Sequence, residues 1–304
     1  MELPTNIFEP LAHDGAAGED SGRLSVTYWQ DVWMRLKQNK LAMLGLVTIT
    51  LLVLMASFGP YLSGFGYEQQ DLNIVNQPPS SAHWFGTDSL GRDLFTRVWY
   101  GARISLLVGV MTSVICLVIG VIYGGISGYA GGRTDDAMMR IVEVLYSIPF
   151  LLYVILLSVV MGPGLMSIFT ALGVVYWLNM ARLVRGQVLA LKEQEYILAA
   201  RVLGASTWRI LLKHLIPNTM GPIIVTMTLL IPEAIFTEAF LSFLGLGVSA
   251  PMASWGVLAS DGLQGLRNYP WQLIFPAIFI SLTMLAFNFL GDGLRDALDP
   301  RMRR

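Results

Sequence analysis

The sequence predicts an all-α protein that crosses a membrane about six times. Of its 304 residues, 54% are hydrophobic and only 13% are charged, about half the charged share of an average soluble domain. The charges are also unevenly spread, because no lysine occurs between Lys40 and Lys192. A soluble core could not hide this much apolar surface, so the apolar segments are expected to face lipid.

Six segments are long enough to cross a bilayer core of ~30 Å, which takes about 20 apolar residues in helical form. The predicted spans are 41–62, 104–128, 141–161, 165–183, 220–244 and 271–290. They leave an N-terminal segment 1–40, an outer loop 63–103, a core 104–293 with the last five spans, and a tail 294–304. Two long loops, 184–218 and 245–270, lie within the core, and loops of this length usually have a function or contain short helices of their own.

The positions of lysine and arginine predict which side of the membrane each loop occupies, since positively charged loops stay in the cytoplasm. With the N-terminus inside, 16 of the 20 basic residues are cytoplasmic. The outer segments keep only Arg92, Arg97, Arg103 and Arg267. Both termini, the tail and the loop 184–218 are therefore expected in the cytoplasm.

The loop 184–218 contains the pattern of a short helix, a turn and a second short helix. An apolar face of small residues recurs at i, i+3, i+4 and i+7, formed by Tyr196, Ala199, Ala200 and Leu203. Gly204 provides a helix stop, because a left-handed conformation costs glycine little. After Ala205, a second helix capped by Ser206 or Thr207 is predicted to run through Leu212, ahead of Pro217 and the fifth span.

Two interpretations of this hairpin are open. It could rest on the lipid surface as an amphipathic element. It could also fit a groove on a partner protein, which the two adjacent alanines favour because they let backbones approach closely.

The same loop resembles the transmembrane permeases of bacterial ABC importers, whose hallmark is Glu-Ala-Ala, three residues, Gly, nine residues and Ile-x-Leu-Pro. This chain has Ala199, Ala200, Gly204, Leu215 and Pro217 at that spacing. It departs from the hallmark at three positions, occupied by Leu198, His214 and Ile216. A role of the family's glutamate is therefore not carried over to Leu198.

Within that family, the chain is most similar to the C-type subunit of oligopeptide and dipeptide importers. The resemblance runs from about Trp29 to the end. It is carried by the loop above and by the segments 85–95, 101–106, 240–247 and 291–300.

This resemblance implies a complex with a homologous B-type permease, two ATPase subunits and an extracytoplasmic binding protein that delivers peptide. The coupling element that docks on one ATPase would be formed by Tyr196, Ala199, Ala200, Leu203, Gly204, Ala205, Ser206 and Pro217. ATP and Mg²⁺ would bind to the ATPase subunits, and this chain would hold no cofactor or metal of its own. A metal chelate such as nickel, or glutathione, is the alternative substrate on the same architecture.

Other classes of protein find little support in the residues. None of the four lysines lies in a P-loop pattern, and no His-Glu-x-x-His or Gly-x-Ser-x-Gly occurs. The chain lacks a basic stripe with interleaved aromatics, so no nucleic-acid partner is expected. An intramembrane enzyme or a channel remains the alternative from a different class.

The glycines at 120, 124, 128 and 132 repeat every four residues and predict a ridge for close helix packing rather than a nucleotide loop.

Polar residues inside the predicted spans are candidates for the translocation path. Placing them in lipid costs free energy, so a polar residue within a span is first considered as a functional residue. The candidates are Tyr146, Trp177, Asn179, Glu233 and Glu238. Ordinary contacts between helices are the alternative. Glu233 and Glu238 are five residues apart, so they are expected to point in different directions.

The outer loop carries a further motif made of turn residues and charges, Gly86, Asp88, Gly91, Arg92 and Asp93. It could contact the extracytoplasmic binding protein. A locally paired turn that packs on the second span is the other interpretation, and the glycines with short-range charges favour it.

Overall fold

The computed structural model describes residues 27–162 and 164–299, and these residues form helices joined by loops, with one isolated β-bridge between Thr87 and Asp93. The all-α prediction is therefore confirmed. The elements are α1 (Tyr28–Gln38), α2 (Lys40–Phe58), η1 (Gly59–Tyr61), η2 (Leu72–Ile74), α3 (Leu94–Ala130), α4 (Gly132–Ser147), α5 (Phe150–Met161), α6 (Leu165–Leu191), α7 (Glu195–Val202), α8 (Thr207–Ile210), the π-helical η3 (Leu211–Leu215), α9 (Ile216–Phe243), α10 (Trp255–Gln264) and α11 (Trp271–Leu298).

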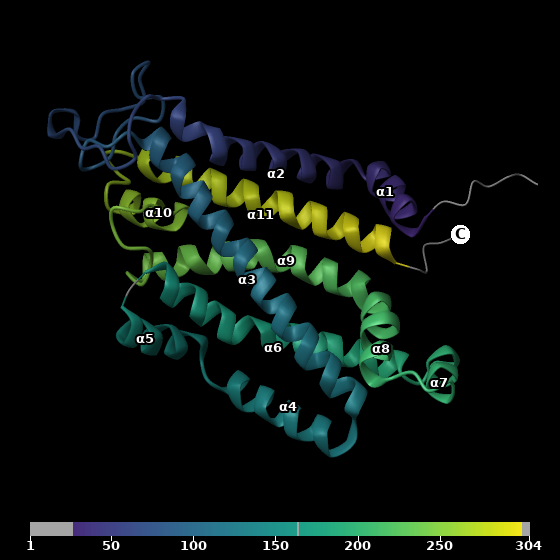
Figure 1. Ribbon diagram of the computed structural model, residues 1–304. Coiled ribbons are helices and arrows are strands. Elements are labelled where there is room, and N and C mark those ends of the chain that lie inside the picture. Colours follow the sequence, from purple (N-terminus) through teal and green to yellow (C-terminus); the bar gives the residue numbers. More distant parts are fainter. Residues whose placement is uncertain (1–26, 163, 300–304) are drawn as a thin grey trace, which may run out of the picture.

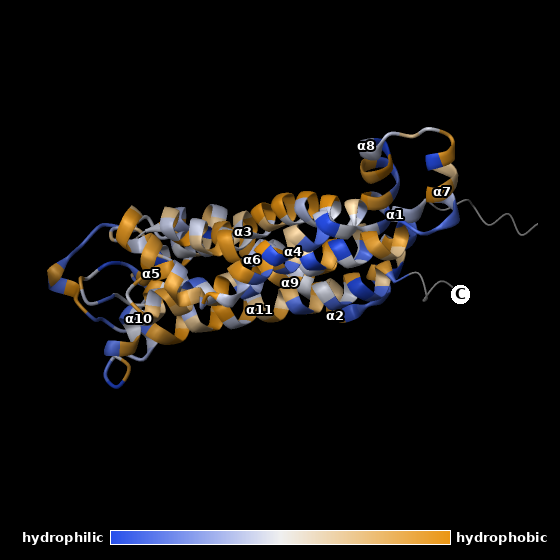
Figure 2. Cartoon of the chain, turned by 90° about the horizontal axis from the view of Figure 1, so that it is seen from below, coloured by the Kyte–Doolittle hydropathy of each residue, from blue (hydrophilic) through white to orange (hydrophobic). Residues whose placement is uncertain are grey.

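Five helical stretches in the described part of the chain are long and apolar enough to cross a membrane, and a bent pair, α4 with α5, makes a sixth. Figure 1 shows them as an elongated bundle in which α2 and α11 run side by side and α3 crosses α6 and α9. Hydrophobic residues cover the middle of the bundle in Figure 2. Many large apolar side chains on α2 are exposed, as lipid-facing residues must be.

The predicted third span, 141–161, is wrong as a single helix. α4 ends at Ser147, α5 starts at Phe150, and the two helices are bent by 81°. The cause is Pro149, which lacks a backbone N–H and disfavours a helical conformation of the residue before it. Ile148 accordingly has extended backbone angles, with φ −81° and ψ 126°.

Three other predicted boundaries are also wrong, because the helices are longer than the predicted spans. α3 begins at Leu94 rather than at Ile104, because the Asp93 carboxylate accepts a hydrogen bond of 2.8 Å from the Thr96 backbone N–H and caps the helix. α6 continues to Leu191, so the first part of the predicted loop 184–218 is helical. α11 continues to Leu298 instead of 290. The predicted spans stop where charged residues begin. The helices continue past those residues because they pack against other parts of the protein.

The close packing of α3 on α6 depends on the predicted glycine ridge. A Cβ atom at Gly120 would lie 2.6 Å from the Met180 Cβ, and one at Gly124 would collide with the Ala181 carbonyl oxygen. Gly128 faces α6 in the same way. The prediction is wrong for Gly132, which begins α4 and has no atom of a neighbour within 4 Å of its Cβ position.

The two ends of the bundle differ in what they carry. In Figure 1, α1, α7, α8 and the end of α11 lie at one end, and the segment 59–93 with α10 lies at the other. α10 is the helical part of the predicted loop 245–270, and its Trp255 is fully buried against α3, where the ring N–H donates to the Val98 carbonyl. Most of the segment 1–40 and the last five residues of the tail lie outside the described residues.

Candidate functional site

The hairpin, defined here as α7, the turn 203–206 and α8, projects beyond the end of the bundle (Figures 1 and 2). Gly204 makes the turn: its φ is +80°, and nothing lies within 4 Å of a Cβ built there. The Ala205 backbone N–H donates to the Ala200 carbonyl at 3.0 Å, the bond that closes a helix through a left-handed glycine. Ser206 then caps α8 by accepting from the Arg209 N–H. The predicted stop and the predicted cap at Ser206 are confirmed.

One side of the hairpin is anchored in the protein. Ile197 and Ile210 are fully buried and share a hydrophobic cluster with Val184 and Val188 of α6, and Ala200 packs against this cluster. Ile197 was missed from sequence because the i, i+3, i+4, i+7 pattern emphasised its neighbours. The anchor therefore packs the hairpin against α6.

The other side of the hairpin has no covering. Val202 and Leu203 are 87% and 86% exposed, and Tyr196 and Ala199 on α7 are exposed as well. The predicted apolar face is therefore split, with Ala200 turned inward and the other three members outward. An apolar tip on a rigid anchor is suited to docking against another surface.

α8 does not end at Leu212 as a separate short helix, which corrects the prediction. The chain passes through the π-helical turn Leu211–Leu215 directly into α9, and Pro217 occupies the first turn of α9, where a missing N–H is tolerated. Asn218 closes this junction by donating to the His214 carbonyl at 2.6 Å. The hairpin is thus continuous with the fifth span.

Three of the five translocation-path candidates meet at one cavity. Tyr146, Asn179 and Glu233 line a cavity of about 430 Å³ at the bend between α4 and α5. Arg182 lies over the Tyr146 ring, 4.3 Å from its centroid. The bend was not predicted, so the approach of Tyr146 to Glu233 could not be derived from sequence.

The other two candidates do not join this cavity. Trp177 is buried, with its ring 4.8 Å from that of Tyr123 in a helix contact. Glu238 is fully buried and accepts hydrogen bonds from Ser105, Ser242 and Ser254, so it links α3, α9 and the start of α10. Both residues make contacts between helices in the structure, and their part in a translocation path stays a prediction.

Other residues of the cavity were missed from sequence. They include Tyr176, whose hydroxyl lies 2.7 Å from the Thr237 hydroxyl oxygen, and Phe240. Thr237 and Phe240 follow Glu233 at i+4 and i+7, so helical spacing from a charged residue could have found them.

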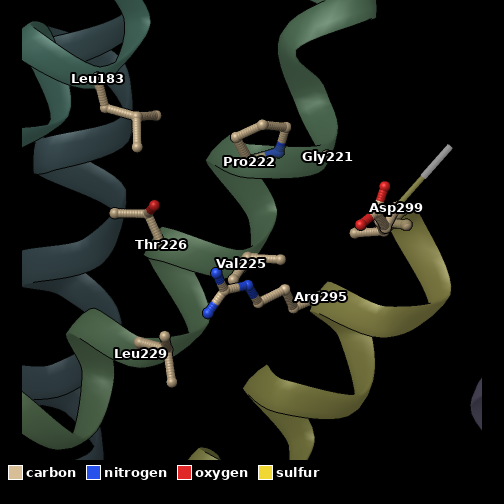
Figure 3. A pocket seen from close by; sticks show the side chains of 9 residues that line it. Leu183, Gly221, Pro222, Val225, Thr226, Leu229, Arg295 and Asp299 are labelled. Atoms are coloured by element: carbon tan, nitrogen blue, oxygen red, sulfur yellow. The ribbon is translucent and has the colours of Figure 1, made fainter. Parts of the chain in front are cut away.

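A second cavity, of about 450 Å³, lies toward the hairpin end between α6, α9 and α11. Its walls include Leu183, Val225 and Leu229. Figure 3 shows Arg295 reaching from α11 toward α9, while Asp299 lies farther along the chain.

The outer-loop motif is buried and satisfied within the chain. Arg92 donates to Asp88 at 2.7 Å, and Asp93 both pairs with His83 at 2.9 Å and caps α3. Gly86 and Gly91 have φ of +79° and +70°, and a Cβ on either would strike the backbone of the segment 71–78. Gln272 of α11 donates to the Thr87 carbonyl at 3.0 Å, which ties the motif to the bundle. This geometry matches a locally paired turn.

These features define a multi-pass helical membrane protein with a hairpin that projects from one end of the bundle. The description "Binding-protein-dependent transport system inner membrane component" belongs to a family model that matches residues 117–304, and "N-terminal TM domain of oligopeptide transport permease C" matches residues 27–79. The chain belongs to the first of these families, the inner-membrane components of binding-protein-dependent transport systems.

Its relatives and a solved structure agree with this placement. The dipeptide permease DppC of Bacillus subtilis is 62% identical over all of this chain and 95% of its own length, and OppC of the same organism is 57% identical over both full lengths. OppC of Escherichia coli K12 is 48% identical over both full lengths. An inward-facing structure of the MetNI methionine ABC transporter, 19% identical, matches 66% of this chain and 94% of its own with a TM-score of 0.55, which shows the shared fold.

Proposed function

We propose that this chain is one transmembrane half of an ATP-driven importer of oligopeptides or dipeptides. Relatives that are 48–62% identical along the full chain are named as oligopeptide and dipeptide permeases, which supports this substrate class. The partners would be a homologous B-type permease, two ATPase subunits that bind ATP and Mg²⁺, and an extracytoplasmic binding protein. Both termini and the hairpin would lie in the cytoplasm.

The exposed tip of the hairpin is the observation that carries the proposal. Val202 and Leu203 would cost free energy if left in water, since burying such side chains contributes about 1.5–3 kcal/mol each. A groove on an ATPase subunit would cover them together with Tyr196 and Ala199. The left-handed Gly204 sets the shape of this tip.

The structure of the anchor suggests how motion would pass into the membrane. The hairpin is joined to α6 through Ile197 and Ile210 and is continuous with α9 through the π-helical turn. A push on the tip would therefore move α6 and α9 as rigid bodies, and these two helices wall the cavity of Glu233. ATP energy would reach the pathway without any chemistry in this chain.

A crosslinking experiment tests the docking of the hairpin. In the complex assembled with its ATPase subunits, a Leu203→Cys variant treated with a short crosslinker should join to an ATPase subunit. Leu62→Cys, exposed at the opposite end of the bundle, is the matched control and should not. Crosslinks of Leu203→Cys to lipid alone would contradict the proposal.

Transport assays test the substrate. Proteoliposomes with both permeases, both ATPase subunits and the binding protein should take up labelled peptides only with ATP, and this chain alone should take up none. Preferred uptake of a nickel chelate or of glutathione would keep the architecture and change the substrate. Peptide turnover or ion flux by the chain alone would favour the enzyme or channel class.

A further inference from the structure

We propose that α6 and α9 form a track for a short peptide, in which Glu233 binds the α-ammonium group and Arg295 the α-carboxylate. The inference rests on the proposed function and goes further, because it assigns the recognition of the two charged ends to named residues. It joins the cavity of Glu233 and the cavity of Arg295 into one path.

One face of α9 lines both cavities. Phe240, Thr237 and Glu233 border the first, and Leu229, Thr226 and Pro222 border the second. Successive members of this series are three or four residues apart, which places all six on one side of a helix. Leu229 and Glu233 are one turn apart, so the two cavities border neighbouring turns of α9.

α6 supplies the opposite wall in the same order. Tyr176 and Asn179 border the first cavity, and Leu183 borders the second. These residues are also three and four apart, so they share one side of α6. The same sides of α6 and α9 therefore border both cavities, with the Glu233 carboxylate in one and the Arg295 guanidinium group of α11 in the other.

The Glu233 end has the chemistry of an ammonium site. Glu233 is exposed to the cavity, and none of the ion pairs in the described part of the chain involves it. The aromatic rings of Phe150 and Tyr176 line the same cavity, and ring faces attract cations. Arg182 is a nearby cation; it lies over the Tyr146 ring, 4.3 Å from the ring centroid, and takes part in none of the ion pairs found among the described residues.

The Arg295 end has the chemistry of a carboxylate site. Its guanidinium group extends toward Val225 and Leu229 on α9 (Figure 3), in a cavity whose other walls are apolar except for Thr226 and the Asp299 carboxylate. It takes part in none of the ion pairs found among residues 27–162 and 164–299. A planar guanidinium group in such surroundings binds a carboxylate through two hydrogen bonds.

The spacing of the two ends fits a short peptide. Eight residues of α9 separate Val225 from Glu233, which is about 12 Å along the helix axis. An extended peptide advances ~3.3–3.6 Å per residue, so three or four residues cover this length. The walls between the two ends, such as Leu229 and Leu183, are apolar. They therefore select little among the side chains of the bound peptide.

A competition experiment tests the track in the complete nucleotide-free transporter, held in lipid nanodiscs without the binding protein. A labelled alanine tetrapeptide that carries a photoreactive residue is crosslinked to the complex. Unlabelled tetrapeptides compete in three forms: unmodified, N-acetylated and C-amidated. Each blocked form should need about tenfold more peptide to compete, because it loses one charged contact.

The variants separate the two ends. In Glu233→Gln, the unmodified and N-acetylated peptides should compete equally well, while the C-amidated peptide should still compete less well than the unmodified one. In Arg295→Gln, the unmodified and C-amidated peptides should compete equally well, while the N-acetylated peptide should still compete less well. Glu143→Gln and Arg140→Gln, an exposed pair on α4, are matched controls and should keep both differences. Unchanged discrimination in Glu233→Gln or Arg295→Gln, or labelling that reaches neither α6 nor α9, would overturn the track.

A second experiment, on the same complexes in proteoliposomes, distinguishes this inference from the proposed function. ATP-driven uptake of the unmodified tetrapeptide is measured in proteoliposomes that contain the binding protein. If the wild-type complex takes up the peptide, but the variants distinguish the blocked from the unmodified peptides as the wild type does, then only the proposal of the track is wrong. If uptake of peptide is absent, the proposed function fails first.

Discussion

Arg185 of α6 and Asp135 of α4 are joined by two hydrogen bonds of 2.6 Å each, and the Ser127 hydroxyl donates to the same carboxylate from α3. The carboxylate is buried, and the bidentate geometry is the strong form of this pair. Three membrane helices therefore meet at one charge pair close to the hairpin end of the bundle.

Replacing Asp135 should destabilise the protein. Asp135→Ala leaves the Arg185 guanidinium without its partner in a partly buried place, so we expect a loss of about 2 kcal/mol in the free energy of unfolding. Thermal unfolding of the purified complex in nanodiscs measures the loss. Glu143→Ala breaks the exposed pair with Arg140 and should change stability by less than about 0.5 kcal/mol. Equal effects of the two changes would contradict this assignment.

The two adjacent glycines of α3 should respond differently to the same substitution. Gly124→Ala places a methyl group against the Ala181 carbonyl oxygen and should separate α3 from α6, at a cost of about 1–3 kcal/mol. Gly125→Ala has only Leu211 Cδ2, at 3.9 Å, near its new methyl group, and should be neutral or slightly stabilising. Yield and melting temperature of the two variants compare them directly. A destabilised Gly125→Ala with a neutral Gly124→Ala would refute the packing argument.

Gly204 should be needed for transport but not for insertion into the membrane. Gly204→Glu forces a side chain into a left-handed conformation, at a cost of about 1–2 kcal/mol, and changes the tip that docks. We expect normal amounts of the protein in the membrane and a loss of ATP-driven uptake of at least tenfold. Gly204→Asn keeps access to that conformation and should retain most of the uptake. Wild-type uptake by Gly204→Glu would speak against a role for this turn.

Glu238 and Glu233 lie on the same helix and should differ in what they control. Glu238→Ala leaves three serine hydroxyls without their acceptor and loosens α10, so we expect a loss of about 3 kcal/mol in stability. Glu233→Gln, at an exposed position, should change stability by less than about 0.5 kcal/mol. Thermal unfolding, with limited proteolysis of the loop 245–270, tests both. Faster cleavage in Glu233→Gln than in Glu238→Ala would reverse the assignment.

Local signals in the chain predicted much of the candidate site. The left-handed Gly204, the Ser206 cap and the glycine packing at 120 and 124 all follow from the conformational limits of one or a few neighbouring residues. The inward turn of Ile197 and Ala200 did not follow, because it depends on Val184 and Val188 of another helix. The grouping of Tyr146 with Glu233 required the 81° bend at Pro149, because a proline marks a break in a helix but does not fix the direction of the next helix.

The sequence by itself determined the six apolar segments, the hairpin turn and the distribution of charge, because lipid and backbone geometry act on each segment separately. Only the tertiary structure decided which polar residues meet. Glu238 became a buried link and Glu233 a cavity wall although both are carboxylates within one helix. The difference arises because burial and partner choice depend on the helices that pack against each face, and residues distant in the chain supply those helices.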